Sequence, residues 1–371
     1  MTDWSSIVVP ALRELPPFDV AATVSEVKAL EEQEQVAKLN WNENLFGPLP
    51  GVLEAARDEL ETAWLYPVAP YAGFRADVAR FAGTDAGRIV PANGTQALIG
   101  TVASAFLLPG DRVVVPELTF GLYALISAAR GAVVHRVPMQ PDLRIDLEAL
   151  VGKACEVEAK LVWVCDPNNP TGLTVSRDEW DVFLAGLPDR CVVVADEAYV
   201  DYLSPNRRIG RERDVADGRP VIVLRSFSKF FGLAGLRLGY AIADEDLVAH
   251  LSVVDEPFNV SCAALAAGRA SLRATEAAEH RRRDVADARA VLREGLRQAG
   301  AEPYPSEANF VLVRVGFDDA MLAEELARSG ILVRPGSEFG LPRHLRITVG
   351  PAPLMERVTS ELRSTLAAVR G

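Results

Sequence analysis

Cysteine and histidine are both scarce in this chain, with four of each among 371 residues. No two cysteines form a C-x-x-C pair, and no two histidines have the H-x-x-x-H spacing. Zinc sites and small disulfide frameworks depend on such close spacings. We therefore expect reduced, mostly buried thiols and no metal site.

Long apolar runs are also missing. No stretch approaches the roughly 18 apolar residues that a membrane-spanning helix needs. The N-terminal sequence MTDWSSIVVPALRELPPFD has no basic segment ahead of its short apolar part, unlike a secretory signal. These features predict a cytoplasmic protein with no membrane partner.

Positive charge is in deficit, because 39 Lys and Arg residues face 51 Asp and Glu residues, giving a formal net charge of −12. A polyanion would be repelled by that overall field, so nucleic acid is not expected as a partner. The basic run Arg281-Arg282-Arg283 lies in a segment rich in Ala, Glu and Asp. We expect this run to be a solvated helix face.

Short valine-rich runs alternate with helical patterns through the middle of the chain. RVVVP, LVWVC, CVVVA and PVIVL show little polar alternation and are bounded by turn residues. Such runs are typical of strands buried on both faces of a parallel sheet. Their alternation with helices predicts an α/β fold with a doubly wound, mostly parallel sheet.

The pattern changes after about residue 250. Residues 263–299 predict one long helix, and NFVLVRV, GILVRPG and HLRITVG predict strands of a smaller α+β unit. A further helix is expected over Val24–Glu34. We predict a large domain at residues 51–250 and a small discontinuous domain formed by residues 1–50 and 251–371.

Polar residues follow four of the predicted strands. They lie at residues 94–96, 166–172, 196–199 and 226–229. Each group has a structural interpretation on its own, as a turn, a helix cap or a surface lysine. In open α/β sheets, however, ligands bind beyond the carboxyl ends of the strands. The order of these groups after successive buried strands therefore predicts one ligand site.

Three segments carry a resemblance to a known family: DPNNPTG, VVADEAY and SFSKFFGLAGLRLGY. The chain resembles the fold-type I pyridoxal phosphate (PLP) aminotransferases from LNWNENLFGP to LRITVG, and most of all their histidinol-phosphate aminotransferase branch. The resemblance implies a homodimer with shared active sites. It also implies two small-molecule partners, an amino donor and an oxo-acid acceptor.

The resemblance assigns the catalytic roles to Lys229, Asp196 and Tyr199. Lys229 is expected to form the Schiff base with the cofactor aldehyde and then to move the substrate α-proton. Asp196 is expected to keep the ring nitrogen protonated, since a nearby carboxylate raises its pKa. Tyr199 and Asn168 are expected to contact the phenolate oxygen of the ring.

The remaining cofactor contacts that the resemblance implies come from several parts of the chain. A phosphate group needs hydrogen-bond donors and positive charge, which a helix start and an arginine supply. Phe120 is expected to stack on the ring, and Tyr66 to reach the phosphate of the partner subunit. The expected phosphate-binding residues of the same chain are Gly94, Thr95, Gln96, Ser226, Ser228 and Arg237.

The expected substrate contacts are Arg346, Arg334 and Asn44. A guanidinium suits either a carboxylate or a phosphate, so Arg346 matches the arginine that holds the substrate anion in the family. Arg334 is expected to be a second anion contact. Asn44 lies on a segment that covers the site in relatives.

Three positions depart from the pattern of the relatives that make histidine. Phe18 stands where those proteins usually carry a tyrosine that touches the substrate phosphate, Gln96-Ala97 replaces an acidic pair, and Phe120 is often tyrosine. These departures favour an aromatic or specialised amino donor over histidinol phosphate, with 2-oxoglutarate as the usual acceptor. A PLP-dependent decarboxylase, lyase or cyclase, and a non-catalytic PLP sensor, are the alternatives.

Overall fold

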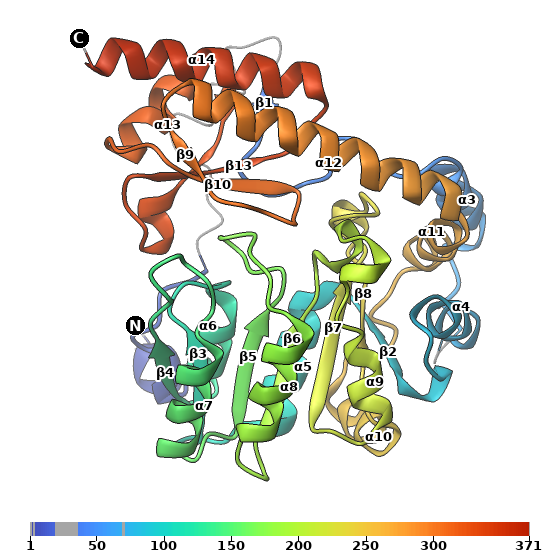
Figure 1. Ribbon diagram of the computed structural model, residues 1–371. Coiled ribbons are helices and arrows are strands. Elements are labelled where there is room, and N and C mark those ends of the chain that lie inside the picture. Colours follow the sequence, from blue (N-terminus) through green and yellow to red (C-terminus); the bar gives the residue numbers. More distant parts are fainter. Residues whose placement is uncertain (1, 3, 19–35, 69–70, 371) are drawn as a thin grey trace.

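The computed structural model of the chain describes residues 2, 4–18, 36–68 and 71–370 (Figure 1). The helix predicted over Val24–Glu34 lies outside these residues. A large sheet with helices on its faces occupies the lower part of Figure 1. A smaller sheet, covered by long helices, lies above the upper edge of the large one.

Within the described residues, the large sheet has seven strands in the order β2-β8-β7-β6-β5-β3-β4. Strands β7, β6, β5, β3 and β4 are mutually parallel, whereas β8 is antiparallel to both of its neighbours. Strand β2 therefore runs in the same direction as the parallel strands, and their carboxyl ends share one edge. The bounds are β2 Ile89–Ala92, β3 Arg112–Pro116, β4 Val133–Val137, β5 Leu161–Cys165, β6 Val192–Asp196, β7 Val221–Ser226 and β8 Gly239–Ile242.

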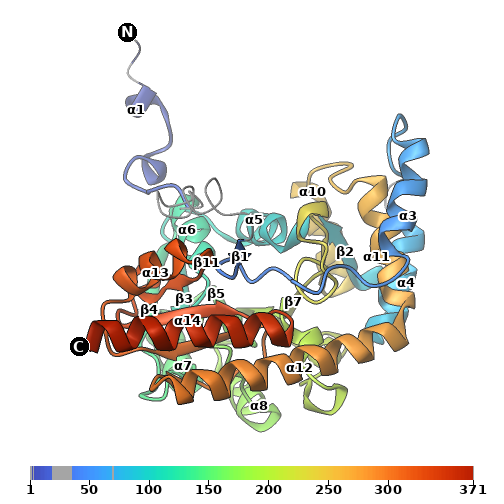
Figure 2. The same cartoon turned by 90° about the horizontal axis from the view of Figure 1, so that it is seen from above.

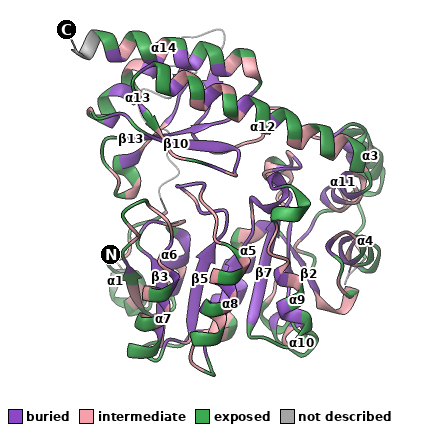
Figure 3. Cartoon of the chain, viewed as in Figure 1, coloured by how far each residue is buried: buried purple, intermediate pink, exposed green. Residues whose placement is uncertain are grey.

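Helices cover both faces of this sheet, as predicted for a doubly wound fold. Successive strand residues point to opposite faces, so Val114 and Val162 pack with helices α7, α8 and α9, while Val113 and Leu161 pack with α5, α6 and α10. Figure 3 shows the central strands buried. The helices are α5 Gly94–Phe106, α6 Leu122–Ala129, α7 Leu147–Glu156, α8 Arg177–Gly186, α9 Arg211–Ala216 and α10 Glu245–Val254.

The smaller sheet is antiparallel, in the order β12-β13-β10-β9, and α12, α13 and α14 lie over it. Strand β1 pairs in parallel with β11, so the N-terminal segment joins the C-terminal third of the chain. The domain boundaries at residues 50 and 250 stay a prediction. The elements are β1 Ala37–Lys38, β9 Glu302–Pro303, β10 Phe310–Arg314, β11 Ile331–Leu332, β12 Arg334–Pro335, β13 His344–Thr348, α12 Thr275–Gln298, α13 Asp319–Arg328 and α14 Ala352–Arg370.

The single helix predicted over residues 263–299 is wrong, because the chain forms two helices there. Helix α11 (Cys262–Arg273) ends at Ala274, which has φ −80° and ψ 51°, and α12 begins at the next residue. Helix α11 packs against α3 (Val52–Glu59) and α4 (Ala72–Ala82), while α12 continues toward α14 (Figure 2). Alanine favours a helix at every position, so only the tertiary packing marks this break. A short helix, α1 (Trp4–Ile7), lies near the N-terminus.

The expected solvated face at Arg281–Arg283 is also wrong for two of its three residues. Arg281 donates hydrogen bonds to the backbone oxygens of Gly47 and Phe46, at 2.5 and 3.1 Å. Arg282 donates to the backbone oxygen of Asp201 at 3.0 Å. Both guanidinium groups also lie over phenylalanine rings. The aliphatic part of an arginine side chain can cover apolar surface while its guanidinium group remains hydrogen-bonded, here to backbone oxygens.

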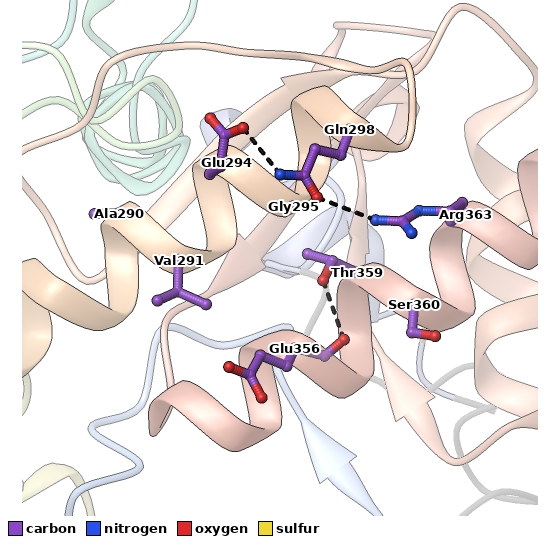
Figure 4. Close-up of a pocket in the computed structure, with 9 residues that line it drawn as sticks. All are labelled: Ala290, Val291, Glu294, Gly295, Gln298, Glu356, Thr359, Ser360 and Arg363. Atoms are coloured by element: carbon purple, nitrogen blue, oxygen red, sulfur yellow. Dashed lines mark hydrogen bonds between the residues drawn. The ribbon is translucent and has the colours of Figure 1, made fainter.

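Helices α12 and α14 cross closely beside a surface groove (Figure 4). A Cβ atom on Gly295 of α12 would lie 2.6 Å from Oγ1 of Thr359 of α14. Glycine therefore allows the two helix backbones to approach at this point. Arg363 of α14 also donates a hydrogen bond to Gln298 of α12 at 3.4 Å.

A buried ion-pair network joins the loops that follow β5 and β6 to β7 and α9. Arg211 donates to Asp166 at 2.7 Å and to Glu197 at 2.8 Å, and all three side chains are buried. Arg225 of β7 donates to the other oxygen of Glu197 at 2.8 Å. The guanidinium of Arg211 also lies 4.0 Å from the centre of the Trp180 ring. Each charge in this network is matched by an opposite charge within hydrogen-bonding distance.

Replacing Arg211 with methionine should destabilise the protein strongly. The substitution leaves Asp166 and Glu197 buried without this partner, and breaking a buried pair in this way costs about 3–5 kcal/mol. We expect that loss in the free energy of unfolding, measured by chemical denaturation. Arg207→Met is the control, since Arg207 pairs with Glu307 at the surface, where such pairs contribute about 0–1 kcal/mol. Equal losses in the two variants would contradict the prediction.

Candidate active site

A cavity of about 730 Å³ lies where the carboxyl edge of the large sheet meets the smaller sheet. Its lining comes from segments far apart in the sequence, including residues 38–43 and 334–346. Most of the predicted site residues are brought together here. Those that line the cavity are Thr95, Gln96, Phe120, Asp196, Tyr199, Ser226, Ser228, Lys229, Arg237, Arg334 and Arg346.

Lys229 lies three residues beyond the end of β7, and its amine lines this cavity. Its Nζ donates a hydrogen bond to the backbone oxygen of Trp41 at 3.0 Å. Burial lowers the pKa of Lys229 to about 8, and the positive charges of Arg346 and Arg237 act in the same direction. A lower pKa leaves a larger fraction of the amine neutral near neutral pH. The neutral amine is the form that acts as a nucleophile or a base.

Asp196, the last residue of β6, is buried at the base of the cavity. Its Oδ2 accepts a hydrogen bond from the Tyr123 hydroxyl at 2.8 Å, and its Oδ1 accepts one from the backbone N–H of Ala198 at 3.0 Å. Burial raises the pKa of Asp196 to about 6, and these two hydrogen bonds oppose the rise. A cation placed against this carboxylate would lower that pKa again.

Tyr123 is a site residue that the sequence reasoning missed. It lines the cavity, and its ring is stacked on Trp163 with the centroids 5.1 Å apart and an interplanar angle of 5°. This stacking fixes the hydroxyl that bonds to Asp196. Tyr123 lies at the start of α6, three residues after Phe120, and both side chains line the cavity.

Tyr199 lies beyond the end of β6, and its ring packs edge-on against Phe310 with the centroids 5.2 Å apart. Its hydroxyl accepts a hydrogen bond from Nδ2 of Asn42 at 3.1 Å, which leaves the phenolic proton available to an acceptor in the cavity. Burial raises the pKa of Tyr199, so the phenol remains protonated at neutral pH.

One end of the cavity has the donor set that a phosphate group requires. Helix α5 begins at Gly94, so the free N–H groups of its first turn and its positive dipole end lie there. Arg237 donates to Gln96 at 3.2 Å and approaches the Ser228 hydroxyl at 3.5 Å. Gly94 has φ 79°, and a Cβ atom there would lie 2.7 Å from Arg237. Glycine therefore allows the guanidinium to lie against the helix start, and the set fits a dianionic phosphate.

Arg346 of β13 lies in the part of the cavity formed by the smaller sheet. It donates to Oδ1 of Asn169 at 2.7 Å and to the backbone oxygen of Asn40 at 2.6 Å. Its buried Nε has no hydrogen-bond partner among the described residues. Burial lowers the pKa of Arg346 to about 10, so it remains a cation at neutral pH. Because both of its bonding partners are uncharged, its charge is available to an anion.

Two of the predicted site residues, Asn168 and Asn44, do not line the cavity and form hydrogen bonds with other parts of the chain. Asn168 bonds to the backbone oxygen of Leu118 and to the side chains of Thr119 and Thr171, so its amide joins its own loop to the loop that follows β3. Its neighbour Asn169 lines the cavity and bonds to Arg346. Asn44 donates to the backbone oxygen of Phe230 at 2.6 Å and holds the covering segment in place.

Tyr66 lies outside the cavity lining and is 80% exposed in this single chain. Its ring packs on Phe258, with the centroids 4.7 Å apart. Trp64 and Val68, on the same segment, are 82% and 87% exposed. With Leu65, which is 52% exposed, four large apolar side chains in five residues form an exposed patch, which is unusual for a monomer surface.

Within the described residues, no group of three or more His, Cys, Asp or Glu side chains is arranged to hold a metal ion, and no helix is both long and apolar enough to cross a membrane. A cytoplasmic location and the absence of a nucleic-acid partner stay predictions.

Comparison with known proteins places the chain in a family. The family model "Aminotransferase class I and II" matches residues 34–362. Histidinol-phosphate aminotransferase 1 of Thiobacillus denitrificans is 37% identical over 368 residues, which cover 98% of this chain and 94% of that protein. The histidinol-phosphate aminotransferase of Symbiobacterium thermophilum is 35% identical and covers 97% of this chain and 99% of its own length.

A solved structure agrees with this placement. The histidinol-phosphate aminotransferase of Sinorhizobium meliloti, in complex with pyridoxal-5'-phosphate, superposes with a TM-score of 0.90 at 26% identity and covers 98% of both chains. The chain therefore belongs to the class I and II aminotransferases. The predicted fold-type I architecture, the aminotransferase class and the cofactor, pyridoxal 5'-phosphate, are confirmed.

Gly94→Ala should weaken cofactor binding. The added Cβ would collide with the Arg237 guanidinium, and one charge-assisted hydrogen bond contributes about 1.5–3 kcal/mol, so we expect the Kd for PLP to rise at least about tenfold. The Kd is measured by quenching of tryptophan fluorescence when PLP is added to the apoenzyme.

Gly110→Ala is the matched control for this prediction. Gly110 has φ 87°, so alanine meets similar backbone strain there, but a Cβ atom would have nothing within 4 Å. A Kd for PLP that is the same in both variants would show that the contact with Arg237 does not matter.

Proposed function

We propose that the protein transfers an amino group between a small-molecule amino donor and 2-oxoglutarate, and that it does so as a homodimer. The donor is histidinol phosphate or an aromatic or related amino acid. The observation that carries this proposal is the convergence of Lys229, Asp196 and Arg346 on one cavity. An amine, a carboxylate and an anion-binding guanidinium are the three groups that the reaction needs from the protein.

Pyridoxal phosphate supplies an aldehyde that condenses with amines and a ring that withdraws electrons from the adjacent carbon. Lys229 is then the base that takes the proton from the α-carbon of the donor and returns it to the cofactor. Its lowered pKa, about 8, supports this role, because the amine can alternate between its two protonation states near neutral pH.

Asp196 holds the proton on the ring nitrogen in this proposal. Its burial and its fixed hydrogen bonds to Tyr123 and Ala198 support the assignment, since an anion in a site of low dielectric stabilises a nearby cation strongly. Tyr199 donates to the phenolate oxygen of the ring. We assign the second donor at that oxygen to Asn169 in place of Asn168, because Asn169 lines the cavity.

Arg346 orients the donor by binding its carboxylate, or the phosphate of histidinol phosphate. The unpartnered Nε and the two bonded Nη groups form the fork that a planar anion matches. Residues 40–42 close this end of the cavity: Asn40 bonds to Arg346, Trp41 to Lys229 and Asn42 to Tyr199. Such a cover excludes water from the reacting groups.

The homodimer is supported by the exposed patch formed by Trp64, Tyr66, Val68 and Phe258. A second copy of the chain would bury these side chains. In the proposed dimer, Tyr66 of each subunit reaches the cofactor phosphate of the other, so both sites depend on assembly.

Val68→Asp should weaken the dimer. We expect the wild-type protein to sediment at twice the chain mass of 40.1 kDa. The variant should dissociate into monomers at a higher protein concentration than the wild type, because burying a charge in the interface is costly. The measurement is sedimentation velocity over a concentration series. Val182→Asp is the control, because Val182 is 73% exposed on α8. A wild-type protein that sediments as a monomer would contradict the proposed assembly.

Lys229→Ala should abolish the visible absorbance of the lysine-bound cofactor and lower turnover by at least about a thousandfold. Lys160→Ala is the control, since Lys160 pairs with Asp111 at the amino edge of the large sheet, opposite the edge that carries the cavity. Near-normal turnover in the Lys229 variant would show that another group is the base.

The amino donor is identified by absorbance spectra of the holoenzyme, recorded as amines are added one at a time. The panel contains glutamate, histidinol phosphate, phenylalanine, arginine and threonine phosphate. A transaminase donor removes the visible band, and 2-oxoglutarate restores it. Release of carbon dioxide or another product, without that restoration, would instead support the decarboxylase, lyase or cyclase.

A further inference from the structure

The second predicted anion contact, Arg334, carries a counter-charge of its own. Arg334 of β12 forms an ion pair with Glu338, which lies four residues later in the turn Gly336–Phe339. Both side chains line the cavity, and they are only 17% and 29% exposed. The Arg334 guanidinium also lies 4.8 Å from the centre of the Trp41 ring. The Glu338 carboxylate and the Trp41 ring therefore fix the position of the Arg334 guanidinium.

The two arginines at this end therefore differ in charge balance. Arg346 bonds to an amide oxygen and a backbone oxygen, both uncharged, so it retains its full charge for an anion. Arg334 is neutralised by Glu338. Lys38, which also lines the cavity, is neutralised in the same way by Glu43 at 2.9 Å.

The walls around this pair are largely aromatic. Trp41 and Phe339 line the cavity beside it. Phe18 also lines the cavity, but it packs edge-on against Phe120, on the side of the large sheet, with the centroids 5.6 Å apart. Arg136 and Glu117 also line the cavity, but they lie on β4 and directly after the end of β3 in the large sheet. The end of the cavity near Arg334 thus combines one compensated charge with apolar ring surfaces.

We propose that Glu338 is a specificity-determining residue that sets the second anion subsite to zero net charge, so that the cavity selects an uncharged aromatic group over a phosphate at the distal end of the substrate. This inference rests on the proposed function, in which Arg346 holds the first anion. A phosphate dianion would meet the Glu338 carboxylate beside Arg334, and like charges placed together reject a ligand. An aromatic ring meets Trp41 and Phe339 and leaves the ion pair intact.

The test uses two acids that bind the holoenzyme without reacting, because neither carries an amine. 3-Phenylpropanoate presents a carboxylate and a distal phenyl ring, and 3-phosphonopropanoate presents a carboxylate and a distal dianion. Their Kd values are measured by isothermal titration calorimetry. We expect the wild-type holoenzyme to bind the phenyl acid at least about tenfold more tightly, and Glu338→Gln to reduce that ratio by about tenfold.

Two further variants make the outcome specific to the charge. Glu338→Asp retains the carboxylate and should keep a ratio close to that of the wild type, whereas Glu338→Ala should reproduce the effect of Glu338→Gln. Glu324→Gln is the matched control, because Glu324 forms an i,i+4 pair with Arg328 on the surface of α13. It should not change either Kd.

The proposal is overturned if the wild-type holoenzyme binds the phosphonate as tightly as the phenyl acid, or if both neutral variants keep the wild-type ratio. Failure of the proposed function has a different signature. In that case no amino donor changes the absorbance of the holoenzyme, whatever the ratio of the two Kd values.

Discussion

The buried ion-pair network around Arg211 is the interaction on which the geometry of the site depends. Three of its members, Asp166, Glu197 and Arg225, lie on segments that carry residues of the cavity lining. Asp166 begins the loop that carries Asn169, Glu197 follows Asp196, and Arg225 precedes Ser226. Parallel strands bring these three loops to one edge, but strand pairing alone leaves the loops beyond the strands free to move. Matched charges of low exposure remove that freedom, because any displacement would separate a charge from its partner in a medium of low dielectric.

A second set of contacts joins the two sheets across the cavity. Residues 40–44 bond to Arg346 of the smaller sheet and to Tyr199, Lys229 and Phe230 of the larger one. Asn309 adds two hydrogen bonds to the backbone oxygens of Asn42 and Glu43. One short segment thus fixes the position of Arg346 relative to Lys229. In the proposed reaction, the spacing between these two groups decides which bond of the substrate lies over the cofactor ring.

Much of the fold could be predicted from the sequence because its signals are local and strong. Valine-rich strands such as Val192–Asp196 are recognisable without a partner, and Lys229, Asp196 and Tyr199 follow such strands directly. The sequence decides less where local patterns are silent. Asn168 and Asn169 are adjacent and chemically identical, so only the path of the loop decides that Asn169 is the one that lines the cavity. The helix break at Ala274 and the buried contacts of Arg281 depend on packing between distant segments, which no local propensity records.

The close crossing of α12 and α14 at Gly295 has a mechanical consequence. Two helices packed this closely over one sheet are expected to move as one rigid unit. Near the other end of α12, Arg281 donates hydrogen bonds to the backbone oxygens of Phe46 and Gly47. The segment that covers the cavity is thereby attached to α12 about four helical turns from Gly295, because the two contacts are 14 residues apart and a turn contains 3.6 residues. A tilt of the smaller sheet would be transmitted through α12 to the segment that covers the cavity. Opening of the cavity and displacement of Arg346 would therefore occur as one movement.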